Sequence, residues 1–338
     1  MHTAHRNRYT TAVLLLLLFL LLAISTASGS YPLTLSDVLT SLREMLLPKA
    51  DQSMPTRVFW SLRLPRVGTA LLSGMILGVA GGVYQLLFRS PLASPDLTGV
   101  ASGASFGAAL AIVLGIGSSW LRMGFAFCGG ILSLILVLLL AHFAGGERIG
   151  TYILAGILIS SAADAGLMVL KTLADPERQL AAIDFWTMGS LAAVSGERFL
   201  PFLLLSLPTL LLLLLFHRPA TMLSLGNDEC RAMGLSPDRW RCILLTLATL
   251  VVSASVSLTG CIGFVGLIAP HITRFLYPQR KGAYLLCCGI IGGILLTAAD
   301  LAAKTIGNGA ELPVSIFTVA AGIPVLTILL CKRGRDMA

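Results

Sequence analysis

Apolar runs long enough to cross a membrane follow one another along almost the whole sequence, separated by short polar turns. A helix needs about 20 apolar residues to cross the hydrocarbon core, and in lipid each span must satisfy its own backbone hydrogen bonds. The sequence therefore predicts an all-α, polytopic membrane bundle of about ten transmembrane helices, in a single domain over residues 1–338. The expected spans lie at about residues 12–27, 64–87, 97–117, 123–143, 151–173, 199–216, 242–259, 262–276, 283–304 and 314–331.

The composition agrees with a membrane protein and excludes a soluble one. Apolar residues make up 56% of the chain, charged residues only 12%, and the mean hydropathy is +0.88. About a quarter of the residues of a soluble domain are charged. The net charge of +8 does not indicate nucleic-acid binding, because the basic residues are scattered at span edges and form no basic stripe. The cysteines show neither zinc-ligand spacing nor a disulfide framework.

The first apolar run has two interpretations. A basic stretch at 5–8 precedes it and small residues follow it, which is also the outline of a signal peptide. Nine further spans favour an uncleaved helix whose basic start stays in the cytoplasm, so that both termini lie on one side. The largest exception to the basic bias toward that side is the cluster Arg57, Arg63 and Arg66, which is expected outside.

Glycines recur at every fourth position in two of the expected spans. The two rows are Gly74, Gly78 and Gly82, and Gly99, Gly103 and Gly107. A row of this kind gives a helix a smooth face where a second helix can approach closely in lipid. The rows therefore predict tight helix packing within a bundle.

Longer polar segments connect some of the spans. Residues 29–60 contain an amphipathic patch at 35–47, which we expect to lie as a short helix on the membrane surface. Residues 176–198 predict short helices on the outer side. The inner insert 219–241 predicts a short helix at about 224–235.

The short inner helix has clear end signals. Asp228 and Glu229 place negative charge in its first turn, and Gly234 can form its C-terminal cap. A helix of about eight residues is not stable alone in water. We therefore expect a partner surface to support it.

No phosphate-binding loop and no metalloprotease motif occurs in the sequence. GxxxxGK[ST] and HExxH are absent, and no carboxylates are paired at catalytic spacing. The one match to GxSxG, at 103–107, falls within a glycine row of an expected span and not at the strand-to-helix turn that a nucleophilic serine of this motif needs. His271 has no second His or Cys at ligand spacing, so we expect a hydrogen-bonded structural histidine. The chain is expected to be no enzyme and to bind no metal or cofactor itself.

Two pairs of ionisable residues stand out within expected spans, where charges are costly and suggest function. Asp164 and Lys171 lie seven residues apart on about the same helix face, which favours a structural ion pair or polar contact over proton coupling. Asp300 and Lys304 have the i,i+4 spacing of a pair along one helix. Alternatively, Lys304 faces a partner at the outer end.

Five segments in order along the chain resemble the FecCD type of permease subunit of type II ABC importers, which serve iron siderophores, haem and cobalamin. These segments are RLPR at 63–66, FRSPLASPDLTGVASGA at 88–104, LSLGNDECRAMGL at 223–235, GFVGLIAPHITRFL at 263–276 and AELPVSIFTVAAGIPV at 310–325. The resemblance covers the chain after about residue 30. It implies a dimer with an identical or paralogous permease, and a cargo path on the dimer axis lined by the fifth span and the short helices after it.

The resemblance also assigns partners and residues. Two cytoplasmic ATPases would bind the 224–235 helix through residues including Leu225, Gly226, Asp228, Glu229, Arg231 and Gly234. A periplasmic or lipid-anchored binding protein would dock outside on Arg63, Arg66 and Lys304, the last of which is often Arg in the family. The inner gate would lie at the turns holding Ser90 and Leu92, and Ile149 and Gly150. Ile149 and Gly150 depart from the family, which has Ser or Thr near the second turn.

The expected function is import of an iron–siderophore chelate across the inner membrane of a bacterium, with ATP and Mg²⁺ on the partner ATPases. Haem and cobalamin are the alternative cargoes. A secondary transporter coupled to ions through Asp164 and Lys171 is a second class, and an intramembrane enzyme, for which no reactive residues are found, is a third.

Overall fold

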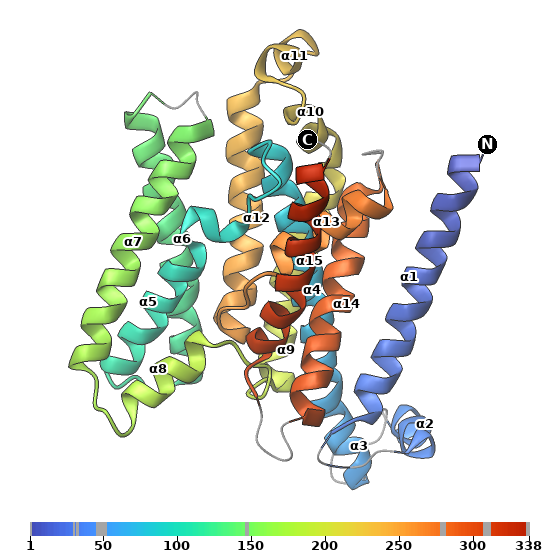
Figure 1. Ribbon diagram of the computed structural model, residues 1–338. Coiled ribbons are helices and arrows are strands. Elements are labelled where there is room, and N and C mark those ends of the chain that lie inside the picture. The colour runs from blue at the N-terminus through green and yellow to red at the C-terminus, as the bar shows by residue number, and fades with distance from the viewer. Residues whose placement is uncertain are drawn as a thin grey trace.

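The computed structural model of the chain is a bundle of helices packed side by side (Figure 1). It describes residues 2–29, 31, 34–44, 53–145, 149–277, 282–306 and 312–335, and these residues include no strand. In chain order the helices are α1 (His2–Ala27), α2 (Leu35–Arg43), α3 (Met54–Val58), the π-helical η2 (Phe59–Arg63), α4 (Leu64–Leu87), the 3₁₀-helical η3 (Pro95–Thr98), α5 (Val100–Val113), α6 (Ser119–Phe143), α7 (Ile149–Leu173), α8 (Gln179–Thr187), α9 (Gly196–Leu215), α10 (His217–Leu223), α11 (Asn227–Ala232), α12 (Pro237–Thr259), α13 (Val265–Leu276), α14 (Tyr284–Ile306) and α15 (Val314–Arg335).

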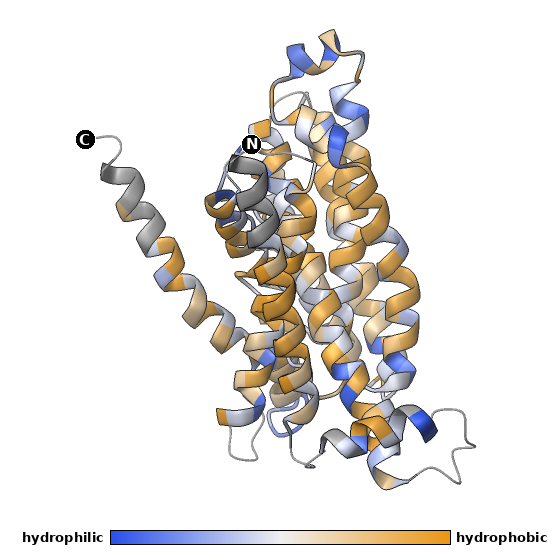
Figure 2. Ribbon diagram, turned by 90° about the vertical axis from the view of Figure 1, so that its right-hand side faces the viewer, coloured by the Kyte–Doolittle hydropathy of each residue, from blue (hydrophilic) through white to orange (hydrophobic). Residues whose placement is uncertain are grey.

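The bundle has two ends that differ in the helices they carry. The short helices α10 and α11 lie at one, here named the α11 end, and α2, α3 and α8 lie at the opposite one, the α8 end (Figure 1). Helix α1 begins and α15 ends toward the α11 end, which agrees with the expected placement of both termini on one side. Apolar residues extend along the helices and hydrophilic residues concentrate at the two ends (Figure 2). This banding is what a lipid bilayer requires.

The expected number of spans is confirmed. Within the described part of the chain, seven helices are long and apolar enough to cross a membrane, and three shorter apolar helices accompany them, at Val100–Val113, Val265–Leu276 and Val314–Thr327. The chain is therefore an all-α membrane bundle with about ten membrane-embedded helices.

Two of the expected spans are shorter than the sequence suggested. Helix α5 has 14 residues, because η3 and the left-handed Gly99 (φ 69°) occupy the positions before it. Helix α13 has 12 residues, because Gly260 and Phe264 both take positive φ and separate it from α12. At about 1.5 Å per residue neither crosses a core of about 30 Å alone. Irregular backbone at membrane depth is tolerated only where protein covers it or where it lines a cavity.

The second span is longer than expected at its first end. Helices α3, η2 and α4 form one apolar stretch of 34 residues, Met54–Leu87, whereas the prediction began at residue 64. Pro55 lies in the first turn of α3, where the N–H groups lack intrahelical partners, and Pro65 lies just after the π-helical turn η2, so neither proline ends the stretch. The predicted amphipathic helix is α2, capped by Thr34 and Asp37; the predicted positions 45–47 lie outside the described residues.

The two glycine rows sit at close helix contacts, as predicted. A Cβ added at Gly74 or Gly78 would overlap carbonyl oxygens of α14, at Gly292 and Cys288. On α5, Gly103 and Gly107 approach the backbone of α6 in the same way. Small residues on both helices therefore hold α4 against α14 and α5 against α6.

Burial divides the bundle into a core and an edge. Helix α4 runs through the middle, and 89% of the most apolar part of the stretch Met54–Leu87 is buried. Helix α7 lies at one side of the bundle, next to α5 and α6 in Figure 1, and only 11% of its most apolar part is buried. Helix α7 therefore presents most of its surface outward.

Candidate functional site

The helix at the tip of the α11 end is shorter than predicted and is capped as predicted. Helix α11 covers Asn227–Ala232 rather than about 224–235. Gly234 takes φ 80°, its N–H donates to the carbonyl of Arg231, and the N–H of Leu235 donates to the carbonyl of Cys230 at 2.9 Å. These two bonds form the Schellman motif that ends many helices. Because glycine adopts positive φ without strain, Gly234 permits the sharp stop.

Helix α11 has one attached face and one exposed face. Cys230 is buried, and its Sγ donates to the carbonyl of Met222 at 3.1 Å, while burial raises the pKa of its thiol. Leu225 is 60% exposed. The charged residues Asp228, Glu229 and Arg231 are also exposed, whereas Gly226 is buried beneath the Glu229 side chain. The predicted coupling residues thus form a mixed apolar and charged surface at the tip.

The attached face of α11 holds a polar cluster, here named the inner cluster. The Oδ1 of Asn227 accepts from Nη2 of Arg89 at 3.2 Å and from Nη2 of Arg241 at 3.1 Å. Arg89, just past the end of α4, has a left-handed backbone (φ 49°), and its Nε donates to the carbonyl of Leu223 at 3.2 Å. One neutral amide oxygen therefore joins the end of α4 to the start of α12 through α11.

Arg241 extends the inner cluster to α7. Its side chain is fully buried, and its guanidinium lies 5.8 Å from the ring centroid of Tyr152, in the first turn of α7. Its Nη1 also lies 3.4 Å from Oδ1 of Asp238, a residue that is 52% exposed. A cation this close to an aromatic face is attracted by the ring quadrupole. Asn227, Arg89, Arg241 and Tyr152 were not among the predicted site residues, and the only signal for them in the sequence is an Asn at a helix start beside a basic span edge.

The predicted gate residues lie next to this cluster. Ser90 and Leu92 follow Arg89 directly, and Leu92 is 62% exposed. Ile149 and Gly150 are not in a turn, as the sequence suggested, but form the start of α7, close in sequence to Tyr152. The inner cluster therefore touches both chain segments predicted to narrow the exit.

A second buried group of charges, here named the outer cluster, lies near the α8 end. Asp300 on α14 is fully buried between two cations. Its Oδ1 lies 3.0 Å from Nε and Nη2 of Arg66 on α4, and its Oδ2 lies 2.7 Å from Nζ of Lys304. The predicted i,i+4 pair of Asp300 and Lys304 is confirmed. Lys304 also donates to Oγ of Ser25 on α1 at 3.1 Å, so the cluster joins three helices.

Arg63 lies close to the outer cluster and binds backbone oxygens. Its guanidinium donates to the carbonyl of Ser28 and, at 2.8 Å, to that of Tyr31. It is 8% exposed, and the side chains of Arg66 and Lys304 are 13% and 4% exposed. The three residues expected to receive a docking protein are thus close together but mostly buried, and their docking role stays a prediction.

Asp164 and Lys171 do not pair with each other, which corrects that part of the sequence interpretation. Lys171 Nζ lies 2.7 Å from Oδ1 of Asp184 on α8, so the ion pair ties the end of α7 to the helix after it. Asp164 is exposed on the outward surface of α7. A partner on a separate helix could not be read from helical spacing within one span.

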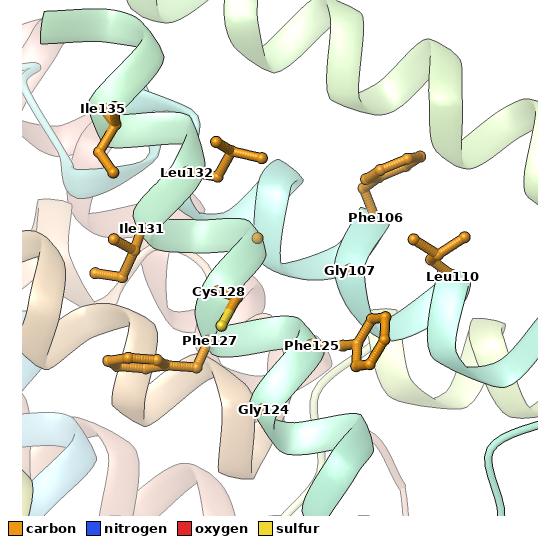
Figure 3. A pocket seen from close by; sticks show the side chains of 11 residues that line it. Phe106, Gly107, Leu110, Gly124, Phe125, Phe127, Cys128, Ile131, Leu132 and Ile135 are labelled. Atoms are coloured by element: carbon orange, nitrogen blue, oxygen red, sulfur yellow. The ribbon is translucent and has the colours of Figure 1, made fainter.

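A pocket between α5 and α6 has no polar side chain to recognise cargo. Its volume is about 580 Å³, and its lining includes Phe106, Leu110, Phe125, Leu132 and Ile135 (Figure 3). Carbon dominates the side chains there, with one sulfur from Cys128. Binding sites for polar ligands need a few placed polar groups. In the described part of the chain no group of three His, Cys, Asp or Glu residues is arranged to hold a metal ion.

His271 behaves as the predicted structural histidine. Its Nδ1 lies 2.8 Å from the carbonyl oxygen of Leu267, one turn earlier in α13, and 3.4 Å from Nε2 of Gln85 on α4. Arg274 Nη2 donates to Oε1 of the same Gln85 at 3.2 Å. These contacts fasten α13 to α4.

Comparisons with known proteins agree with this geometry. The vitamin B12 import system permease protein BtuC of Escherichia coli O157:H7 is 36% identical over 82% of this chain and 84% of its own length. The molybdate import system permease protein MolB of Haemophilus influenzae is 33% identical over 95% of each chain.

Among solved structures, an inward-facing ABC transporter assigned to the metal-chelate type matches with a TM-score of 0.85 at 32% identity. The match covers 96% of this chain and 99% of that one. PsaBC from Streptococcus pneumoniae, at a TM-score of 0.57 and 19% identity over 86% of this chain and 94% of that one, shares the fold alone. The model of the FecCD transport family matches residues 15–332. The chain belongs to the FecCD transport family and is a permease subunit of a type II ABC importer.

Proposed function

We propose that this permease moves a metal chelate of the iron–siderophore class through the cytoplasmic membrane of a bacterium. The observation that carries the proposal is the likeness to the metal-chelate type transporter over 96% of the chain. Cobalamin is the second candidate cargo and molybdate the third, because relatives with those printed names align over most of their length. Haem stays an alternative on the family resemblance alone.

The outward surface of α7 is the proposed contact with a second permease subunit, identical or paralogous. An apolar helix that is 11% buried in one chain gains packing when two copies meet there. The cargo path would then run between the two α7 helices, with α8 at its outer mouth. Asp164, exposed on α7, would face this region.

The proposed engine is a pair of separate ATPases that hold ATP and Mg²⁺ and bind the exposed face of α11. Movement of α11 would reach the inner cluster first, because Asn227 is the first residue of α11 and binds both Arg89 and Arg241. From there it would reach Ser90 and Leu92 through the chain after Arg89. It would reach Ile149 and Gly150 through Tyr152.

The proposed docking site for the cargo-binding protein is Arg63, Arg66 and Lys304 at the α8 end. Acidic side chains of that protein would compete with Asp300 for the same cations. Desolvated pairs between arginine and carboxylate fix orientation as well as affinity. The chain itself is proposed to bind no cofactor.

A reconstitution tests the proposed function. Proteoliposomes holding the permease with its two ATPases and binding protein are supplied with ferric siderophore, haem, cobalamin or molybdate, each in labelled form. The proposal expects ATP-dependent accumulation of the ferric siderophore, unchanged by an uncoupler and abolished when the ATPase loses its catalytic acid. Accumulation of only cobalamin, haem or molybdate would reassign the cargo. Accumulation by the permease alone that collapses with an ion gradient would support a secondary transporter instead.

A further inference from the structure

A pocket at the α8 end contains two arginines and is separate from both charge clusters. It has a volume of about 300 Å³ and lies among α5, α6, α8, the start of α9 and the end of α12. Its polar lining includes Arg122, Arg198, Ser119, Ser190 and Thr259. Among the described residues no Asp or Glu lines it. The wall therefore carries positive charge and hydroxyl groups without a carboxylate.

Both arginines use only part of their hydrogen-bonding capacity within the chain. Arg122 Nη2 lies 3.2 Å from Oγ of Ser119 and 3.4 Å from the carbonyl oxygen of Gly117. Its Nε is buried and has no hydrogen-bond partner among the described residues. Arg198 Nη1 donates to the carbonyl of Ala193 at 3.0 Å. A guanidinium has five N–H donors, so both arginines keep donors on their terminal nitrogens for an anion.

The acids next to lining residues in the sequence do not neutralise the pocket. Asp184, on α8, is paired with Lys171 at 2.7 Å. Glu197, next to Arg198, is exposed at the start of α9. Neither Arg122 nor Arg198 forms an ion pair with a described acid. Both arginines are half-buried and line a pocket to which the described residues bring no counter-charge, so the arrangement favours a bound anion.

The pocket lies at the level expected for lipid headgroups. It is at the start of α6 and the end of α12, both of which are long enough to span a membrane. Phe185, in the lining, is 45% exposed, and Trp120, next to the lining residue Ser119 in α6, is 47% exposed. Exposed aromatic residues at the ends of membrane helices mark the boundary between lipid and water. The apolar part of the lining, with Met123 and Leu258, also suits a ligand that carries acyl chains.

We propose that Arg122 and Arg198 form a binding site for a phosphate group, supplied by the phosphodiester of a membrane lipid. Arginine is suited to phosphate because its planar donors bind two oxygens at once. The site would hold a lipid against α8, α9 and α12 at the α8 end. This inference does not depend on which cargo the permease moves.

Binding of short-chain lipids to the purified full chain in detergent tests the site. Native mass spectrometry measures the binding of dioctanoyl phosphatidylglycerol and of dioctanoylglycerol, which has the same chains and no phosphate. The expected result is one preferred phosphatidylglycerol on the wild type, at least about tenfold weaker binding by the double variant Arg122→Gln, Arg198→Gln, and no preferred dioctanoylglycerol. Recovery by Arg122→Lys, Arg198→Lys would be partial, because lysine keeps the charge and loses the bidentate geometry.

Two controls keep the outcome decisive. Arg178→Gln removes an exposed arginine at the same end and is expected to leave lipid binding unchanged. Thermal unfolding of each variant identifies loss of fold. If millimolar inorganic phosphate displaces the lipid and binds the wild type alone, the site is a phosphate site whose source is the free anion. Equal binding of phosphatidylglycerol by wild type and folded double variant would overturn the proposal.

Discussion

The inner and outer clusters use opposite chemistry to hold two cations. In the outer cluster a charged and fully buried carboxylate, Asp300, lies between Arg66 and Lys304. In the inner cluster a neutral amide oxygen, from Asn227, accepts from Arg89 and Arg241, and the acid that pairs with Arg241, Asp238, is half exposed. The bonds of the inner cluster have a charge on the donor only, whereas the outer cluster adds the Coulomb attraction of opposite charges in a buried site. The outer cluster is therefore suited to clamp helices, and the inner cluster to let them rearrange.

The clamp predicts the largest effect on stability. Asp300→Asn would leave Arg66 and Lys304 buried without their counter-charge, at an expected cost of about 3–5 kcal/mol in the free energy of unfolding. Thermal unfolding in nanodiscs measures the change, with the exposed Glu177→Gln as the matched control. An Asp300→Asn protein as stable as the control would contradict the clamp.

Loss of the Asn227 amide is expected to lower stability less than loss of the Asp300 carboxylate does, and to impair the coupling of ATP hydrolysis to uptake more. Asn227→Ala removes the shared acceptor, and we expect the free energy of unfolding to fall by about 1.5–3 kcal/mol. We also expect the cargo moved per ATP hydrolysed to fall about fivefold or more. Uptake and hydrolysis are measured together in proteoliposomes.

Asn227→Asp is the converse test of the same residue. It would give the inner cluster a carboxylate like that of the outer one, so the cluster is expected to become more stable and uptake slower. Faster uptake in this variant would contradict the idea that weak binding allows movement.

Removal of the aromatic contact between Arg241 and α7 is expected to weaken the packing of α7 against α12 by about 1 kcal/mol. Tyr152→Leu removes the aromatic face below the guanidinium, while Tyr152→Phe keeps it. We expect the Phe variant to couple ATP hydrolysis to uptake like the wild type and the Leu variant to couple it less well. Equal coupling in both variants would show that α7 responds to the ATPases through contacts other than that between Tyr152 and Arg241.

The smallest effect concerns pH at the α8 end, away from the outer cluster. Thr56 and Ser53 donate to Glu44, and these bonds lower the pKa of its carboxyl below 4.5. The stability that these bonds give to the folded protein is fully present above the ordinary pKa of a glutamate. It is lost as the pH falls through the lower pKa that Glu44 has in the folded protein. The protection of the α2 and α3 amides, which is the intrinsic exchange rate at the same pH relative to their observed rate, should fall in that acidic range in the wild type. In Glu44→Gln the protection should be lower already at neutral pH and should change less on acidification, and a wild-type pH profile of protection in the variant would contradict this.

Several features could be predicted from the sequence because they depend on neighbours along the chain. Hydrophobicity alone indicates the spans, since lipid leaves a backbone few folds to choose from. The spacing of Gly74 and Gly78 predicts a close helix contact, Gly234 a helix stop, and Asp300 with Lys304 a pair one turn apart. Local periodicity and backbone freedom are properties of the sequence itself.

Other features were decided only by the tertiary structure, because they join residues far apart in the chain. Arg66 meets Asp300 across 234 positions, and Arg89 meets Asn227 across 138. Lys171 binds Asp184 rather than Asp164 because α8 folds back beside the end of α7. Hydropathy shows that a charge in lipid needs a partner, but many acids and amides could serve. Only the packing of the helices brings one of them within hydrogen-bonding distance.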